Sequence, residues 1–192
     1  MKKEYAFLFI AVAFVVGIVV GVIAAVYYED KSAPVSSPMK QPAASAPAVP
    51  TAEMQNQIAS LQTILKGDPK NLTALVQLGN LYFDTDQADK AIETYSKAIE
   101  LDPKNADLRT DLGIMYRRKG EFDRAVAEFQ KAAEINPTHV NSRYNLGIVL
   151  LHDKSDMKGA IKAWEDFLKV EPKGERADTI RDRLEKMRSM AK

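Results

Sequence analysis

The chain has 192 residues and a formal net charge of +1 at pH 7, with 46% hydrophobic and 28% charged residues. A chain of this length accommodates one ordinary domain together with additional segments. It contains no cysteine, which excludes disulfides, thiolate catalysis and cysteine-based zinc sites.

Residues 5–28 form an apolar segment without a charged side chain. As a helix that rises about 1.5 Å per residue, the segment would reach about 36 Å, enough to cross a hydrocarbon core of about 30 Å. Lys2 and Lys3 precede it. Because the positive end of a span normally stays in the cytoplasm, we expect the rest of the chain to be exported. The sequence thus predicts a single-pass protein with a transmembrane anchor in residues 1–30. In a bacterium the anchor would lie in the inner membrane and the remaining chain on its periplasmic side.

The alternative interpretation of this segment is a cleaved signal peptide. The apolar region of a signal peptide spans about 7 to 15 residues and ends near a small-x-small site. The apolar segment here is longer, and the best cleavage candidate, at Ala44 and Ala46, lies far downstream of it. We therefore favour an uncleaved anchor.

Small residues recur at every fourth position of the expected span and would form a ridge on one face: Ala13, Gly17, Gly21 and Ala25. A ridge of this kind lets two transmembrane helices approach closely, and would allow the span to form a homodimer. Small residues are also common in spans that do not pair.

Residues 31–52 have the composition of a linker, and residues 53–192 have that of a folded domain. The linker is rich in Pro, Ala and Ser, and we expect it to act as an extended tether. From residue 53 onward basic and acidic residues are equal in number. A nucleic-acid-binding domain usually has a basic excess, so we do not expect nucleic acid as a partner.

A glycine within a helical pattern occurs three times at a spacing of 34 residues, in the segments LGNLYF, LGIMYR and LGIVLL. Further along the chain, each of these glycines is followed in turn by an alanine, an aromatic residue and a proline at similar spacings. The glycine, alanine and proline positions are Gly79, Ala91 and Pro103, then Gly113, Ala125 and Pro137, then Gly147, Ala160 and Pro172. A fixed period of this length is typical of a stacked array of repeats.

The glycines have a packing explanation. A glycine inside a helix costs about 1 kcal/mol relative to alanine, so we expect each one where the two helices of a repeat cross closely. On this interpretation Gly79 faces the region of Ala91, and the proline ends the second helix. Asn71 and Asn105 are well placed to cap the next helices.

This pattern resembles the tetratricopeptide repeat (TPR) family. The first repeat has all its signature residues: Leu75, Leu78, Gly79, Tyr82, Ala91, Tyr95, Ala98 and Pro103. The second repeat departs from the pattern at Arg109, and the third departs at Arg143, Leu150 and Phe167. The third repeat also has one extra residue, which we place in the turn HDKSDMKG. The resemblance implies an all-α solenoid of three helix-turn-helix repeats.

Two further amphipathic stretches flank the repeats, and we expect them to cap the stack. The expected organisation is an anchor (1–30), a linker (31–52) and a TPR domain (53–192). Within the domain we expect a half-repeat or cap at 53–70, repeats at 72–105, 106–139 and 140–174, and a capping helix at 175–190.

Catalytic patterns are missing from the sequence. His139 occupies the position of Asn71 and Asn105 and is interpreted as a helix-start residue, and His152 as a surface residue at a helix end. There is no glycine-rich phosphate loop, since the glycines occur singly. We expect a binding protein without enzymatic activity, cofactor or metal.

In TPR proteins the first helices of successive repeats line a concave groove that binds a peptide or a helix. The resemblance places nine residues in this groove: Val76, Asn80, Phe83, Thr110, Ile114, Arg117, Tyr144, Ile148 and Leu151. The clamp for acidic peptide tails needs Lys and Arg in this set, where Val76, Thr110 and Tyr144 stand instead. The set is mostly apolar and suits an amphipathic helix or an extended apolar peptide. The alternative is that some of these side chains pack between neighbouring repeats.

The layout as a whole predicts a membrane-anchored interaction scaffold or assembly adaptor. An N-terminal span, an exported linker and the segments LKGDPKN and AIKAWEDFL are similar to the membrane-anchored TPR proteins of bacterial cytochrome c maturation. That resemblance implies a more specific function, a chaperone that holds apocytochrome c for haem attachment.

Overall fold

The computed structural model describes residues 51–190. The expected anchor, with its ridge of Ala13, Gly17, Gly21 and Ala25, lies outside the described residues, as does nearly all of the expected linker. Within the described range, no helix combines the length and the apolar character that a membrane span requires.

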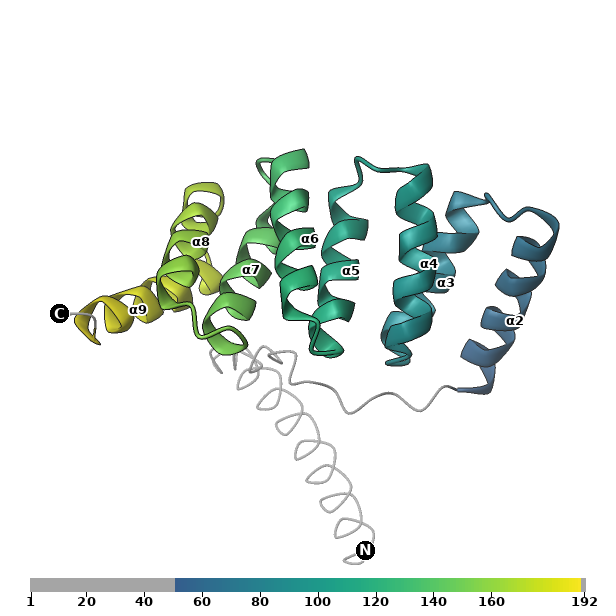
Figure 1. Cartoon of the computed structure of the whole chain (residues 1–192), viewed down its shortest axis with the longest axis horizontal. Helices are drawn as coiled ribbons and strands as arrows, with labels where there is room; N and C mark the ends of the chain where they lie inside the picture. Colours follow the sequence, from purple (N-terminus) through teal and green to yellow (C-terminus); the bar gives the residue numbers. More distant parts are fainter. Residues whose placement is uncertain (1–50, 191–192) are drawn as a thin grey trace, which may run out of the picture. The chain divides into compact units, whose positions relative to one another are not determined.

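The described part of the chain is all-α, as the sequence predicts, and contains eight helices and no strand (Figure 1). The helices are α2 (Ala52–Gly67), α3 (Leu72–Asp84), α4 (Ala88–Leu101), α5 (Ala106–Arg118), α6 (Phe122–Ile135), α7 (Val140–His152), α8 (Met157–Val170) and α9 (Glu175–Met190).

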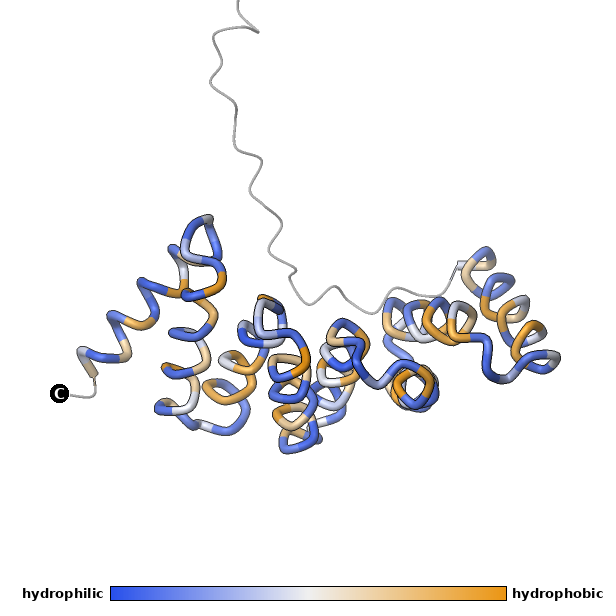
Figure 2. The backbone as a smooth tube through the Cα atoms, turned by 90° about the horizontal axis from the view of Figure 1, so that it is seen from above, coloured by the Kyte–Doolittle hydropathy of each residue, from blue (hydrophilic) through white to orange (hydrophobic). Residues whose placement is uncertain are grey.

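The helices are stacked as antiparallel pairs. The first helix of each pair, called helix A below, is α3, α5 or α7, and it packs against its helix B, which is α4, α6 or α8. Successive helices A also contact each other, α3 with α5 and α5 with α7. α2 packs on α3 at one end and α9 on α8 at the other, and the pairs follow one another along a row (Figure 2). This arrangement brings the exposed sides of the three helices A next to each other.

The helix starts agree with the sequence prediction. Asn71 and Asn105 are N-caps, and their side-chain oxygens accept hydrogen bonds from the backbone N–H groups of Ala74 and Leu108. His139 is the N-cap of α7 and accepts a hydrogen bond from the backbone N–H of Ser142 at 3.3 Å. These caps satisfy donors that a helix start leaves without an intrahelical partner.

The extra residue of the third repeat lies in the turn between α7 and α8, as predicted. That turn covers residues 153–156, whereas the turns of the first two repeats cover 85–87 and 119–121. Ser155 takes a positive φ of 55° there, in the left-handed region. The insertion is therefore absorbed outside the helices, and both helices of the pair keep their contacts.

The repeat glycines lie directly against an aromatic ring of helix B. A Cβ on Gly79 would lie 2.6 Å from the ring of Tyr95, and one on Gly113 would lie 2.7 Å from the ring of Phe129. The group nearest to each of these glycines is therefore the aromatic ring of helix B. Tyr95 lies one helical turn after Ala91, and both side chains are buried.

The two ends of the stack differ in how well they are covered. α9 buries the apolar stripe Ala177, Ile180, Leu184 and Met187, and so covers the end of the third repeat. α2 buries Leu61 but leaves Ile64 exposed. Both were expected to be caps, but only α9 has its whole apolar stripe buried.

Candidate peptide-binding surface

The three helices A carry all nine residues of the predicted groove. Asn80 is exposed, and seven residues are half-buried: Val76, Phe83, Ile114, Arg117, Tyr144, Ile148 and Leu151. These eight side chains, together with Asp111, are called the helix A surface below.

Thr110 is the exception among the nine, because it is buried between helices. Its hydroxyl donates a hydrogen bond to the carbonyl of Ala106 at 2.8 Å and lies 3.5 Å from Nδ1 of His139, at the start of the next helix A. Thr110 thus belongs to the contact between α5 and α7, which is the alternative that the sequence left open for this set.

Each of the two aromatic residues on the helix A surface has an arginine over its ring. The Arg118 guanidinium lies 4.3 Å from the ring centroid of Phe83, and it donates hydrogen bonds to the Phe83 carbonyl at 2.9 Å and to Asp86 at 3.2 Å. The guanidinium of Arg176, from α9, lies 5.6 Å from the ring centroid of Tyr144. An arginine over an aromatic face adds a weak attraction and holds the ring in place.

Tyr144 and Arg117 are further held by the third repeat. The ring of Tyr144 packs at a tilt against that of the buried Phe167, with 5.8 Å between centroids. Arg117 forms an ion pair with Asp153, at the end of the next helix A. Phe83, Tyr144 and Arg117 are therefore held by contacts within the protein, and side chains held in this way lose less entropy on binding.

Asp111 lies on α5, one of the three helices A, and the sequence analysis did not single it out. Burial raises the pKa of this carboxyl to about 6, and the negative charges of Asp107 and Asp84 contribute to the same shift, while His139 opposes it. The equivalent positions of the other repeats hold neutral amides, Gln77 and Asn145. That contrast between repeats was visible in the sequence and could have drawn attention to Asp111.

Two neighbours of Asp111 are themselves held by hydrogen bonds. Nε2 of His139 lies 2.9 Å from Oδ1 of Asp107, so the imidazole connects α5 and α7. The Tyr95 hydroxyl donates to Oδ1 of Asn80 at 2.8 Å. Burial, followed by the charges of Asp111 and Asp84, raises the pKa of Tyr95, so this phenol stays neutral and keeps its proton for the bond. The amide of Asn80 consequently presents its N–H groups outward.

Comparisons with known proteins agree with this geometry. A family model described as TPR repeat matches residues 79–116 and 113–153. A structure described as the crystal structure of MamA is 27% identical, with a TM-score of 0.63, and the match covers 70% of this chain and 84% of that one. The first TPR of Spaghetti (RPAP3), solved bound to the HSP90 peptide SRMEEVD, is 26% identical, with a TM-score of 0.55, over 63% of this chain and 96% of that one.

A further similar structure is a MamA fragment from Desulfovibrio magneticus RS-1. It is 20% identical, with a TM-score of 0.59, over 62% of this chain and 67% of that one, and therefore supports the fold alone. A comparison with curated proteins finds no match.

Residues 79–153 match the TPR repeat, and the described domain has the fold of a TPR protein. TPR domains typically serve as non-enzymatic scaffolds for protein–protein interaction, and the described domain has that architecture. Within residues 51–190, no group of three or more His, Asp or Glu side chains is arranged to hold a metal ion.

Proposed function

We propose that this protein is a membrane-anchored scaffold whose helix A surface binds an amphipathic helix or an extended apolar peptide of a partner protein. The observation that carries the proposal is that half-buried apolar side chains lie on all three helices A, and that successive helices A contact each other. Half-buried apolar side chains extend from Phe83 on α3 through Ile114 on α5 to Ile148 on α7. Such side chains retain apolar area that a partner can cover, which is the main favourable term in association.

The acidic side chains near the helix A surface indicate what kind of segment it binds. Asp111 lies among the apolar side chains with Asp84 and Asp107 near enough to raise its pKa. A basic side chain of the partner would relieve this repulsion, since an opposite charge stabilises a carboxylate. We therefore expect the bound segment to combine apolar residues with a Lys or Arg.

This preference differs from that of one structural neighbour. The TPR domain of Spaghetti was solved with the peptide SRMEEVD, which ends in acidic residues. In the present chain Val76 and Tyr144 stand where an acidic tail would need basic residues, and Asp111 lies nearby. An acidic tail should accordingly be a poor ligand.

The location and the pathway are proposed from the sequence. The uncharged segment 5–28 with Lys2 and Lys3 before it supports a single-pass anchor and an exported TPR domain. A second candidate function is that of a chaperone holding apocytochrome c for haem attachment. It rests on the similarity of layout and of the segments LKGDPKN and AIKAWEDFL.

Site-specific photo-crosslinking in native membranes tests the proposal. A photo-reactive amino acid replaces Ile148, on the helix A surface, or Lys97, an exposed residue of α4, in the full-length chain. We expect a discrete crosslinked partner from position 148, and a weaker crosslink when Asp111→Asn is added. Equal crosslinking from both positions would refute binding on the helix A surface.

The chaperone candidate has its own test. A synthetic peptide copying the C-terminal helix of an apocytochrome c is titrated against the full-length chain in detergent. Saturable binding that Tyr144→Ala weakens would support it. No saturation at millimolar peptide would refute this candidate and leave the scaffold proposal standing.

A further inference from the structure

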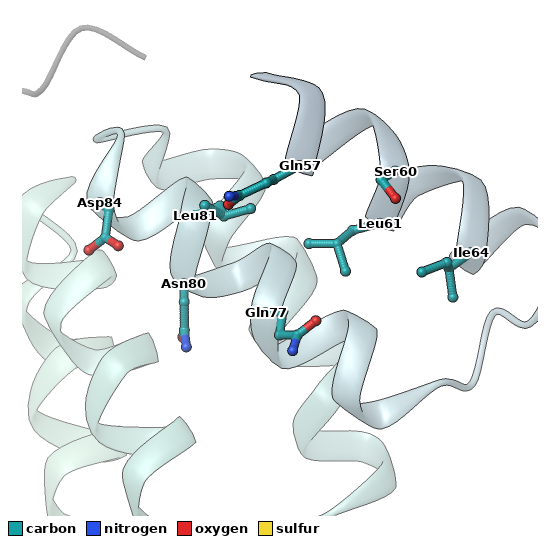
Figure 3. A pocket seen from close by; sticks show the side chains of 8 residues that line it. All are labelled: Gln57, Ser60, Leu61, Ile64, Gln77, Asn80, Leu81 and Asp84. Carbon is teal, nitrogen blue, oxygen red and sulfur yellow. The ribbon is translucent and has the colours of Figure 1, made fainter. Parts of the chain in front are cut away.

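At the N-terminal end of the stack, α2 has no helix A of its own repeat packed beside it among the described helices. The 34-residue spacing of the repeats explains why. α2 lies 34 residues before α4, so it is a helix B whose own helix A is not among the described helices. Beside it, α2 and α3 line an open pocket of about 550 Å³, and each helix contributes four of the lining side chains (Figure 3). We call this pocket the N-terminal slot.

The α2 side of the slot consists of residues that face helix A in a complete repeat. Leu61 stands at the position of Tyr95, whose ring packs on Gly79 of helix A. Ile64 stands at the position of Ala98, Ala132 and Phe167, each with 0% of its surface exposed. Ile64 itself is 45% exposed. The position is buried wherever helix A is present, and open here.

The α3 side of the slot shows the same relation. Leu81 lines the slot and is half-buried, whereas its equivalents Met115 and Val149 are 0% exposed, because a preceding helix A packs beside each of them. Within the described residues, both walls of the slot thus lack a neighbouring helix A that precedes α2. The shape that completes them is a helix of the size of α3, lying antiparallel to α2.

The segment directly before α2 does not predict a helix of this kind. Residues 34–50, just before α2, contain five prolines and no counterpart of the Leu-Gly signature, so the sequence does not predict a helix A there. Among residues 51–190, a second copy has no unpaired helix of this kind either. The apolar stripe of its α9 is already buried in its own fold, and its helices A are paired with their helices B.

Charge indicates which end of an incoming helix is basic. Between the first two repeats, Arg118 donates to the Phe83 carbonyl and to Asp86, at the C-terminal end of the preceding helix A. Asp84 occupies the position of Arg118 at the slot, and Glu53 lies in the first turn of α2. None of the eight lining side chains is basic. The charge pattern is therefore reversed, and the last turn of the incoming helix should carry Lys or Arg, which its dipole also favours.

We infer that the N-terminal slot is a second binding site, which shares only Asn80 with the helix A surface. It accepts one amphipathic helix of a partner protein that has an apolar stripe and a basic last turn. The helix docks antiparallel to α2 and parallel to α3, and so completes the half-repeat. This inference does not require the helix A surface to bind anything.

A peptide that copies residues 105–118 tests the slot, because it is a helix A of this chain that ends in two arginines. The peptide carries fluorescein, and its anisotropy is followed as full-length protein in detergent is added. We expect saturable binding that Ile64→Asp weakens at least about tenfold. Leu101→Asp is the matched control, since Leu101 is a similarly exposed apolar residue on α4, away from α2. Binding should be unchanged in this variant and in Tyr144→Ala.

A charge exchange tests the orientation. Asp84→Lys should weaken binding of this peptide about tenfold, and a peptide in which glutamate replaces both arginines should bind Asp84→Lys better than it binds the parent protein. Ile64→Gln provides a milder second variant, and circular dichroism verifies that every variant keeps its helix content.

Three results would overturn the inference. The first is equal peptide binding by the parent and Ile64→Asp. The second is self-association of the parent protein that Ile64→Asp abolishes in analytical ultracentrifugation, because a second copy would then fill the slot. The third is binding that becomes much tighter after deletion of residues 31–50, because the chain's own segment would then be the occupant.

Discussion

The ring of Tyr95 on α4 lies against Gly79 on α3, so closely that a Cβ at Gly79 would come within 2.6 Å of the ring. The ring is buried, and its hydroxyl is tied to Asn80, which leaves it little room to move. The same relation recurs between Gly113 and Phe129. In this chain the repeat glycine is therefore required because an aromatic ring of helix B, in the same repeat, packs against it.

Replacing Gly79 with alanine should destabilise the protein. Alanine favours a helix by about 1 kcal/mol, but the collision with Tyr95 should cost more, and we expect a net loss of about 1–3 kcal/mol in the free energy of unfolding. The matched control is Gly67→Ala. A Cβ at Gly67 meets no atom within 4 Å, so this change should stabilise by about 0.4–1 kcal/mol. Urea unfolding measures both variants, and equal effects would contradict the ring-contact explanation.

The helices were predictable because short-range signals specify them. Asn71 and Asn105 begin helices through bonds to residues three positions later, and such local chemistry can be read directly from a sequence. The stacking itself follows from the repeat period, because each repeat buries its apolar side against the next.

The details of the binding surface were less predictable because they depend on residues far apart in the chain. Arg176 comes from α9 to cover Tyr144, and His139 reaches Asp107 on the preceding helix A. The burial that shifts the pKa of Asp111 likewise arises from helix stacking. Which atoms lie nearest to Gly79 likewise depends on the crossing geometry of α3 and α4.

Tyr144→Ala and Phe83→Ala should each weaken partner binding by about 1–3 kcal/mol, because buried aromatic side chains tend to dominate binding energy. Lys97→Ala, on an exposed side of α4, should leave binding unchanged. Affinity is measured with the partner identified by crosslinking. Tyr144 also packs on Phe167, so its variant should melt earlier, and binding is compared at temperatures where both proteins are folded. Unchanged affinity in both variants would assign these rings a structural role alone.

The proposed topology predicts the side of the membrane on which the C-terminus lies. If the host is a bacterium, alkaline phosphatase fused after Lys192 should be active, because residues 31–192 are expected to be exported. Replacing Lys2 and Lys3 with glutamate should reduce that activity, since it removes the positive residues before the span. Strong activity of a reporter that works only in the cytoplasm, fused at the same point, would contradict the topology.

The helix A surface should contribute a specific dependence of stability on pH through Asp111. Its pKa is about 6 in the folded protein, against an ordinary value of 3.8. The folded state therefore binds the proton more tightly than the unfolded state, and stability falls as the pH rises from about 4 to 6 and then levels off. Asp111→Asn should raise the free energy of unfolding by about 1–3 kcal/mol above pH 7 and change it little below pH 4.

The measurement is the difference between variant and parent in urea unfolding at several pH values, which cancels the titration of the other carboxyls. Asn145→Asp is the reciprocal variant, because it places an acid at the equivalent position of the third repeat, and it should destabilise at neutral pH. A difference between Asp111→Asn and the parent that does not vary with pH would contradict the raised pKa. If Asp111 contributes to binding a basic side chain of the partner, the Asp111→Asn protein should be more stable than the parent and should bind the partner more weakly. Stability and affinity would then change in opposite directions at one side chain.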